Sequence, residues 1–233
     1  MAQKKLARFA ELGTLPNVLQ FPANAAGKWG AFFKNEQPLI LELACGKGEY
    51  AVGLGELQPR KNFIGVDLKG NRIWVGAKEA LRRGLSNVAF LRIQIDQLRE
   101  YFAAGEVQEI WITFPDPHLR KSKAKKRLTH PKFLRLYQSI LGPGGIIHLK
   151  TDSPVLFQFT RKVLEMYRCT IHEEIEDLYS EKNVAAELKI RTHYEGLDIA
   201  GSRKVHYLKF SLPADLPGTE SDLKLKQVLQ DEE

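Results

Sequence analysis

Five short apolar runs recur along the chain, and each is bounded by turn-forming residues. They span residues 38–43, 62–66, 87–93, 107–113 and 146–150. Their length and their β-branched residues are typical of buried parallel strands. Stretches with apolar residues at helical spacing follow them, at residues 49–57, 71–83, 97–104, 131–141 and 154–166. This alternation predicts an α/β fold with a doubly wound, Rossmann-like, mostly parallel sheet.

The hydrophobic pattern changes after Tyr167. Residues 168–173 and 205–211 alternate between apolar and polar side chains, as half-buried strands do. We expect these two segments to pair antiparallel at the edge of the sheet. The sheet then has seven strands, with an antiparallel C-terminal edge strand. Gly84 predicts a helix end and Ser153 a helix start, because glycine favours the left-handed terminal turn and serine caps free amides.

The chain divides into one domain and two appendages. Residues 1–27 are expected to form a basic, partly flexible N-terminal arm, residues 28–211 the domain, and residues 212–233 an acidic, disordered tail. The tail has six acidic residues and two lysines, so the rest of the chain has 33 basic against 22 acidic residues. This uneven charge favours a polyanionic partner such as nucleic acid.

The composition argues against several classes of protein. With 43% hydrophobic and 27% charged residues, the chain is typical of a globular protein. Two cysteines are too few for a disulfide framework, and no apolar stretch approaches the length of a membrane span. The six histidines lack the spacing of metal ligands, so no metal is expected. With no signal-peptide pattern, the expected location is the cytoplasm.

A rigid acidic turn follows the fourth predicted strand. Pro115 and Pro117 end this strand and flank Asp116, which therefore lies where open α/β sheets place ligands. Six cationic residues come next, with no acid among them: Arg120, Lys121, Lys123, Lys125, Lys126 and Arg127. Such a run is either a solvated loop or a phosphate-binding surface. The neighbouring acid favours a site that orients a base while the cations hold phosphates.

A glycine-rich turn follows the first predicted strand. Gly46 and Gly48 let the backbone approach a ligand, and Asp67 lies at the distance along the chain of a ribose-binding acid. Glu42, just before the turn, would repel the pyrophosphate of a dinucleotide. It suits the ammonium group of S-adenosylmethionine, although a buried ion pair with Lys47 is the alternative.

Six motifs occur in one order: Leu-Glu-Leu-Ala-Cys-Gly-Lys-Gly at 41–48, Gly-Val-Asp at 65–67, Phe-Pro-Asp-Pro at 114–117, Lys-Lys-Arg-Leu-Thr-His-Pro at 125–131, Leu-Lys-Thr-Asp at 149–152 and Thr-His-Tyr-Glu at 192–195. Together they resemble the bacterial tRNA (guanine-N7-)-methyltransferase family of class I methyltransferases. This resemblance implies methyl transfer from S-adenosylmethionine to N7 of a guanosine in the variable loop of tRNA. It implies tRNA as the partner and leaves open a monomer or a homodimer.

The resemblance also assigns roles to matching positions. Glu42, Gly46, Gly48 and Asp67 would bind the cofactor, and Gln94 stands where the family has an adenine-binding Asp. Asp116 would be the catalytic residue, with an orienting and electrostatic role, and would also bind the cofactor. The residues expected to bind the RNA substrate are the six cations of the basic run together with Asp152, Thr192, His193, Tyr194 and Glu195.

Two other functions compete with this interpretation. A nicotinamide-dependent oxidoreductase shares the glycine turn and Asp67 but has no use for Glu42 or the basic run. A noncatalytic RNA-binding protein on the same fold explains the charge. It does not explain acidic residues at three successive strand ends.

Overall fold

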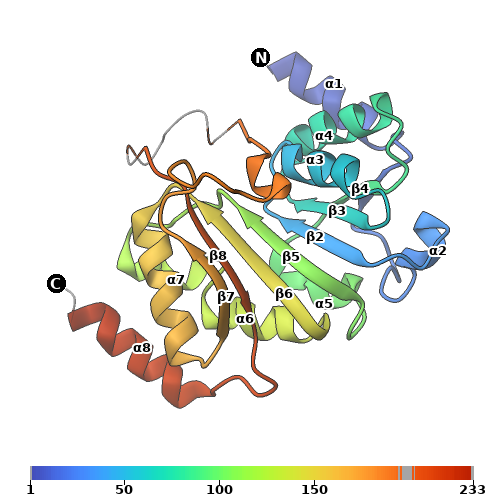
Figure 1. The fold of residues 1–233 in the computed structure, drawn as a ribbon. Helices are drawn as coiled ribbons and strands as arrows, with labels where there is room; N and C mark the ends of the chain where they lie inside the picture. The colour runs from blue at the N-terminus through green and yellow to red at the C-terminus, as the bar shows by residue number, and fades with distance from the viewer. Residues whose placement is uncertain (1, 194, 196–200, 202, 232–233) are drawn as a thin grey trace.

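The computed structural model describes residues 2–193, 195, 201 and 203–231. Within this part of the chain, eight strands form one sheet in the order β1-β4-β3-β2-β5-β6-β8-β7 (Figure 1). The strands are β1 (Val18–Gln20), β2 (Leu39–Leu43), β3 (Asn62–Asp67), β4 (Val88–Arg92), β5 (Val107–Thr113), β6 (Leu141–Thr151), β7 (Thr170–Ile175) and β8 (His206–Ser211). The predicted Rossmann-like, mostly parallel fold is confirmed.

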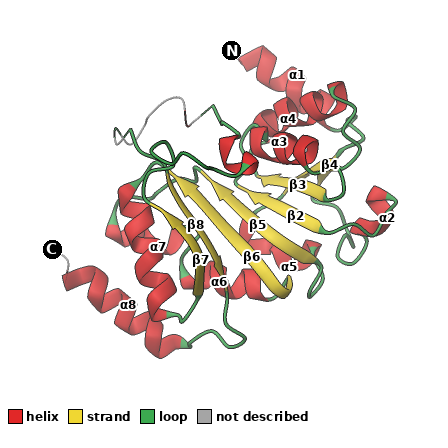
Figure 2. Cartoon of the chain, in the orientation of Figure 1, coloured by secondary structure: helices red, strands yellow, loops and turns green. Residues whose placement is uncertain are grey.

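Helices cover both faces of the sheet (Figure 2). They are α1 (Ala2–Leu12), α2 (Trp29–Phe33), α3 (Glu49–Leu57), α4 (Gly70–Arg82), α5 (Leu98–Tyr101), α6 (Pro131–Gln138), α7 (Pro154–Met166) and α8 (Thr219–Asp231), with short 3-10 helices η1 (Ile95–Gln97), η2 (Lys121–Lys126) and η3 (Ala186–Lys189). One apolar core packs α1, α3 and α4 on one face, and a larger one packs α2, α5, α6, α7 and α8 on the other. No described helix is long and apolar enough to cross a membrane.

Local sequence signals explain several element ends. The hydroxyl of Ser153 accepts a hydrogen bond from the Leu156 amide at 3.2 Å and begins α7, with Pro154 as its first residue. Gly84 follows α4 with a φ of +68°, the left-handed conformation that glycine adopts without strain. All five residues of β2 are buried, as a parallel strand with helices on both faces requires.

The described part of the N-terminal arm forms a helix and a strand, and its predicted partial flexibility stays a prediction. Helix α1 packs on α4, where a carboxylate oxygen of Glu11 accepts a hydrogen bond from the Trp74 indole at 2.9 Å. The guanidinium of Arg8 lies 4.6 Å from the centre of the same ring. Strand β1 then pairs parallel with β4 and adds the eighth strand to the sheet. Three residues are too few for hydrophobic periodicity to reveal a strand.

The acidic tail contains a helix, α8, at residues 219–231, and its predicted disorder stays a prediction. Helix α8 packs against the rest of the protein through Leu225, which is 2% exposed. Asp222 accepts two hydrogen bonds from the Arg135 guanidinium, at 2.8 and 3.0 Å, and a third from the Tyr167 hydroxyl. These long-range contacts stabilise a helix whose composition alone resembles that of a disordered tail.

The two C-terminal strands pair antiparallel, as predicted, but β8 is not the edge strand. It lies between β6 and β7 and is antiparallel to both. Strand β7 forms the edge of the sheet, with its residues largely exposed. Because β8 returns alongside β6, the described residues 176–193 that follow β7 lie at the carboxyl end of the sheet beside the cavity described below.

Candidate active site

A cavity of about 840 Å³ lies at the carboxyl ends of β2, β3, β5 and β6. Carboxylates at or after the ends of four strands that are neighbours in the sheet line it: Glu42, Asp67, Asp116 and Asp152. The parallel strands bring these residues together because their carboxyl ends meet at one edge of the sheet. Glu49, at the start of α3, adds a fifth carboxylate. Among the described residues, no cluster of three or more His, Cys, Asp or Glu side chains could hold a metal ion.

Glu42 forms the buried floor of the inner end of the cavity. Its carboxylate accepts hydrogen bonds from the Ala51 amide at 2.8 Å and the Thr113 hydroxyl at 2.9 Å. Burial, with smaller contributions from the nearby Glu49 and Asp67, raises the pKa of Glu42 to about 8 against the opposing effect of these two hydrogen bonds. Both donors are neutral, so a cationic group reaching this end of the cavity would gain a strong electrostatic partner.

Asp67 is held at the end of β3 by backbone amides. One carboxylate oxygen accepts a hydrogen bond from Gly46 at 2.9 Å, and the other accepts one from Lys69 at 2.8 Å. Each oxygen keeps a further lone pair for a ligand. The side chain is thereby fixed at the mouth of the glycine turn before any ligand binds.

The two glycines of the turn serve the fold directly. Gly46 and Gly48 have φ values of +56° and +69°, which residues with a side chain rarely adopt. A Cβ atom on Gly48 would lie 2.3 Å from the Phe90 ring. Neither glycine lines the cavity, whereas Ala44 and Cys45 beside them do. Their predicted contact with a cofactor therefore stays a prediction.

Gln94 lies away from the cavity lining. It is exposed, directly before η1, and Asp96 two residues later is exposed as well and paired with Lys132. Neither side chain is among those that line the cavity. The predicted adenine contact of Gln94 has no support from this geometry and stays a prediction.

Asp116 lies at the outer end of the cavity, on a strained turn. Its side chain is 74% exposed, and one carboxylate oxygen accepts a hydrogen bond from the His118 amide at 3.1 Å. Phe114 and His118, on either side of the turn, have φ values of +46° and +43°. Such values are uncommon outside glycine and cluster at functional sites, where the surrounding structure maintains them.

The basic run forms a loop around η2 beside Asp116. Five of its six cations are exposed: Arg120, Lys121, Lys123, Lys125 and Lys126. The loop is anchored by the buried Ala124 and Leu128. The exposed ammonium and guanidinium groups therefore lie on a surface of defined shape at the mouth of the cavity.

Arg127, the sixth cation, is placed differently from the other five. It is 3% exposed, and its guanidinium donates hydrogen bonds to the carbonyl oxygens of Pro117 and His118, both at 3.1 Å. The same group lies 4.4 Å from the centre of the Phe159 ring. Arg127 thus ties the loop to the turn that carries Asp116. It also lines the second hollow described below, and its predicted contact with the substrate stays a prediction.

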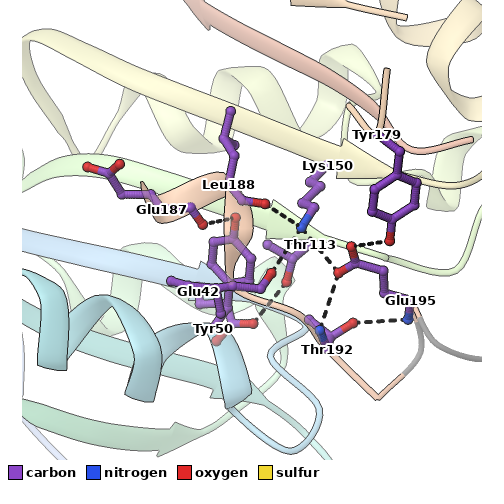
Figure 3. A network of polar contacts seen from close by, with 10 residues as sticks. Glu42, Tyr50, Thr113, Lys150, Tyr179, Glu187, Leu188, Thr192 and Glu195 are labelled. Carbon is purple, nitrogen blue, oxygen red and sulfur yellow. Dashed lines mark hydrogen bonds and ion pairs between the residues drawn. The ribbon is translucent and has the colours of Figure 1, made fainter. Parts of the chain in front are cut away.

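Asp152 and Thr192 line the cavity, as expected for residues that meet the substrate. His193 is exposed, and Tyr194 lies outside the described residues. Glu195 differs from the prediction, because its side chain is only 2% exposed and forms an ion pair with Lys150 at 3.1 Å (Figure 3). Its carboxylate therefore faces the interior and does not line the cavity.

A second hollow of about 890 Å³ adjoins the outer end of the cavity and shares Leu119, Pro154 and Val155 with it. Lys121 from the basic loop and Arg161 from α7 contribute cationic groups to its lining. The outer end therefore opens onto a surface that can accommodate more of a large substrate than one base.

Sequence reasoning missed two buried polar residues that organise the site. Thr113 donates a hydrogen bond to Glu42, and Lys150 pairs with Glu195. A lysine at the end of an otherwise apolar run, as at 146–150, was the available signal for the second. Nothing local pointed to Thr113, because threonine is ordinary at a strand end.

The doubly wound sheet with an acid-lined cavity at its carboxyl edge defines a Rossmann-like fold. The solved structure of the 16S rRNA methyltransferase KamB has this fold, with a TM-score of 0.58, 15% identity, and coverage of 78% of this chain and 94% of that one. The 30S ribosomal A1408 methyltransferase from an uncultured bacterium also has it, with a TM-score of 0.53, 16% identity, and coverage of 80% and 93%.

The sequence is more specific than the fold. A family described as "Putative methyltransferase" matches residues 36–208. Two relatives are named tRNA (guanine-N(7)-)-methyltransferase. That of Bacteroides thetaiotaomicron is 44% identical over 97% of this chain and 92% of its own length, and that of Porphyromonas gingivalis is 46% identical over 91% and 92%. The chain belongs to the tRNA (guanine-N(7)-)-methyltransferase family, which confirms the resemblance found in its motifs.

Proposed function

We propose that this enzyme transfers a methyl group from S-adenosylmethionine to N7 of a guanosine in the variable loop of tRNA. The observation that carries the proposal is the arrangement of one cavity. At its inner end lies the buried acid Glu42, which accepts hydrogen bonds from two neutral donors. At its outer end lies Asp116, beside an exposed basic loop. This arrangement suits a cationic cofactor inside and a polyanionic substrate outside.

The residues at the inner end fit S-adenosylmethionine. Glu42 would accept the ammonium group of its methionine part, and Asp67 would accept hydrogen bonds from the ribose hydroxyls with the lone pairs that Gly46 and Lys69 leave free. When bound, this cofactor supplies an electrophilic methyl group on sulfur. The fixed carboxylates orient it without rearrangement of the strand ends.

The outer end is suited to a guanine base. Asp116 can accept hydrogen bonds from guanine N1–H and the 2-amino group, which adenine cannot donate together. Guanine N7 has an in-plane lone pair and no proton, so its attack needs no general base. Positive charge moves onto the purine as the bond forms, and a carboxylate beside it interacts more strongly in the transition state than in the ground state.

The exposed cations suit the phosphates of tRNA. Lys123, Lys125 and Lys126 stand on η2 next to the turn that carries Asp116. A surface of this kind supplies affinity and register, while the base is selected inside the cavity. The proposed place of action is the cytoplasm, where the tRNA substrate is made.

The proposal is tested by incubating the protein with tritium-labelled S-adenosylmethionine and tRNA that lacks 7-methylguanosine. We expect label in 7-methylguanosine after digestion to nucleosides, and none with tRNA whose variable-loop guanosine is replaced by adenosine. Calorimetric titration with S-adenosylmethionine, its demethylated product and NAD tests the cofactor, and binding of NAD alone would indicate an oxidoreductase. Binding of RNA without methyl transfer would indicate a noncatalytic protein.

A further inference from the structure

Lys150 lies between the two segments that form the outer end of the cavity. It is at the carboxyl end of β6, 0% exposed, and lines neither of the two hollows at the cavity. Its ammonium group donates hydrogen bonds to the carbonyl oxygens of Leu188 and Ile190, both at 3.0 Å, and to Glu195 at 3.1 Å (Figure 3). All three partners belong to the segment between β7 and β8.

On its other side, Lys150 contacts the turn that carries Asp116. The Phe114 amide donates a hydrogen bond to the Lys150 carbonyl oxygen at 2.8 Å. The ammonium group lies 5.6 Å from the centre of the Phe114 ring and 5.4 Å from that of Tyr50. Phe114 has a φ of +46°, so the backbone here needs support from its surroundings.

Glu195 extends this contact to Thr192. Its carboxylate accepts hydrogen bonds from the Tyr179 hydroxyl at 2.6 Å and the Thr192 amide at 3.3 Å, and its own amide donates to the Thr192 hydroxyl at 3.2 Å. The Thr192–Glu195 turn is therefore closed by its own hydrogen bonds and joined to β6 through Lys150. Thr192, the member of the turn that reaches the cavity, depends on these contacts for its position.

We propose that Lys150 is a positioning residue that fixes the distance between the Asp116 turn and the Thr192 turn, and so shapes the guanosine end of the cavity. Glu195 and Tyr179 belong to the same hydrogen-bond network, and none of the three residues contacts the substrate. This inference rests on the proposed function and adds three residues that act by positioning the turns at the guanosine end. Burial lowers the pKa of Lys150, and the ion pair with Glu195 opposes this effect.

The cofactor end does not depend on this network. Glu42 is positioned by Ala51 and Thr113, and Asp67 by Gly46 and Lys69. Loss of the Lys150 contacts should therefore impair positioning of the base and leave cofactor affinity unchanged. A general loss of stability would affect both.

The test uses a double variant, Lys150→Met with Glu195→Gln, because removing one partner alone leaves an unpaired buried charge. We expect the single-turnover rate of methyl transfer, with cofactor and tRNA saturating, to fall by about 10- to 100-fold through misplacement of the base. The dissociation constant for S-adenosylmethionine should equal that of the wild type. The milder Tyr179→Phe removes one donor to Glu195 at a half-exposed position, and its rate should fall by about fivefold.

The matched control is Lys61→Met, which breaks a partly buried ion pair with Glu109 at the opposite end of the sheet. It should lower the thermal midpoint and keep the single-turnover rate. If both Lys150 and Tyr179 variants transfer methyl groups as fast as this control, the inference is wrong. It is equally wrong if cofactor affinity falls by the same factor as the rate. If the double variant does not fold, Tyr179→Phe alone decides. A wild-type protein that binds cofactor but methylates no tRNA would refute the proposed function instead.

Discussion

The two ends of the cavity hold their carboxylates in opposite ways. At the inner end, Glu42 is 3% exposed and each of its oxygens already accepts a hydrogen bond from a neutral donor. At the outer end, Asp116 is 74% exposed and is fixed by two flanking prolines and one amide. The inner acid is thus desolvated by the fold, whereas the outer acid stays in water until a substrate covers it.

This difference separates binding from catalysis. Desolvation of the inner acid raises the free energy of the empty site. A bound cation removes this penalty and so increases the affinity of the site for the cation. A solvated acid gains strength only when the bound RNA excludes water around it, so it contributes most to the transition state. Substitution of Glu42 should therefore change cofactor affinity, and substitution of Asp116 should change the rate of methyl transfer.

The largest expected effect is on the rate and comes from Asp116→Asn. This change keeps an acceptor and removes the charge, so turnover should fall by ~10²–10³, the usual scale for one preorganised electrostatic group. Cofactor affinity and most tRNA affinity should be retained. Single-turnover methyl transfer at saturating tRNA measures this. An unchanged rate would mean that Asp116 only shapes the turn and that Asp152 offsets the charge on the purine.

The next effect is on affinity and comes from Glu42→Gln. We expect S-adenosylmethionine to bind about 10- to 100-fold more weakly, because a charge-assisted hydrogen bond is lost. The unliganded variant should stay folded, since the Thr113 hydroxyl can turn to accept from the amide. Glu56→Gln on the exposed side of the same helix α3 is the control. Equal affinity in the two variants, measured by calorimetry, would remove Glu42 from the cofactor site.

A third prediction concerns the pH dependence of cofactor binding. Burial raises the pKa of Glu42 from its ordinary 4.5 to about 8, so the empty site holds a proton at neutral pH. A bound ammonium group favours the ionised form, so cofactor binding releases this proton. Affinity should rise with pH, by up to about tenfold per unit, and level off above about 8. Between pH 4.5 and about pH 8, Glu42 binds more protons in the folded state than in the unfolded state. Its contribution to the free energy of unfolding therefore falls as the pH rises through this range.

The Glu42→Gln variant isolates this effect from the titration of the cofactor's own amino group, which both proteins share. Calorimetry in two buffers of different ionisation enthalpy gives the number of protons released. Equal proton release by wild type and variant would contradict the assignment.

The smallest effect is expected from the basic loop. Replacing Lys123, Lys125 and Lys126 with alanine should raise the Michaelis constant for tRNA and reduce the salt slope of binding by about 0.7–0.9 per charge. The rate at saturating tRNA should be unchanged. Replacing Lys224 and Lys226 on α8 in the same way is the control. If the salt slope stays the same, the loop is a solvated surface.

Sequence patterns predicted the parts of the fold that local chemistry decides. The alternation of apolar runs predicted the central strands and helices, and the prolines around Asp116 predicted the turn at the cavity. These features depend on neighbours a few residues away. The acids at the strand ends could be placed on one edge of the sheet because parallel topology leaves no other arrangement.

Features that depend on distant contacts could not be predicted in this way. Helix α8 is held by Arg135 and Tyr167, far earlier in the chain. Arg127 has the same charge as its neighbours, but its burial against Phe159 gives it a different role. Glu195 belongs to a motif that suggested substrate contact, and only its pairing with Lys150 shows that it faces inward.

The proposed electrostatic role of Asp116 is tested most directly by the pH profile of the chemical step. In the proposed mechanism no proton leaves N7. At saturating cofactor and tRNA, the wild-type single-turnover rate should therefore be constant from about pH 6.5 to about pH 8.5. The rate of Asp116→Asn should be lower and equally constant. A wild-type rate that rises about tenfold per pH unit through neutrality, and loses this dependence in Asp116→Asn, would show that the residue accepts a proton as a general base and would contradict the account.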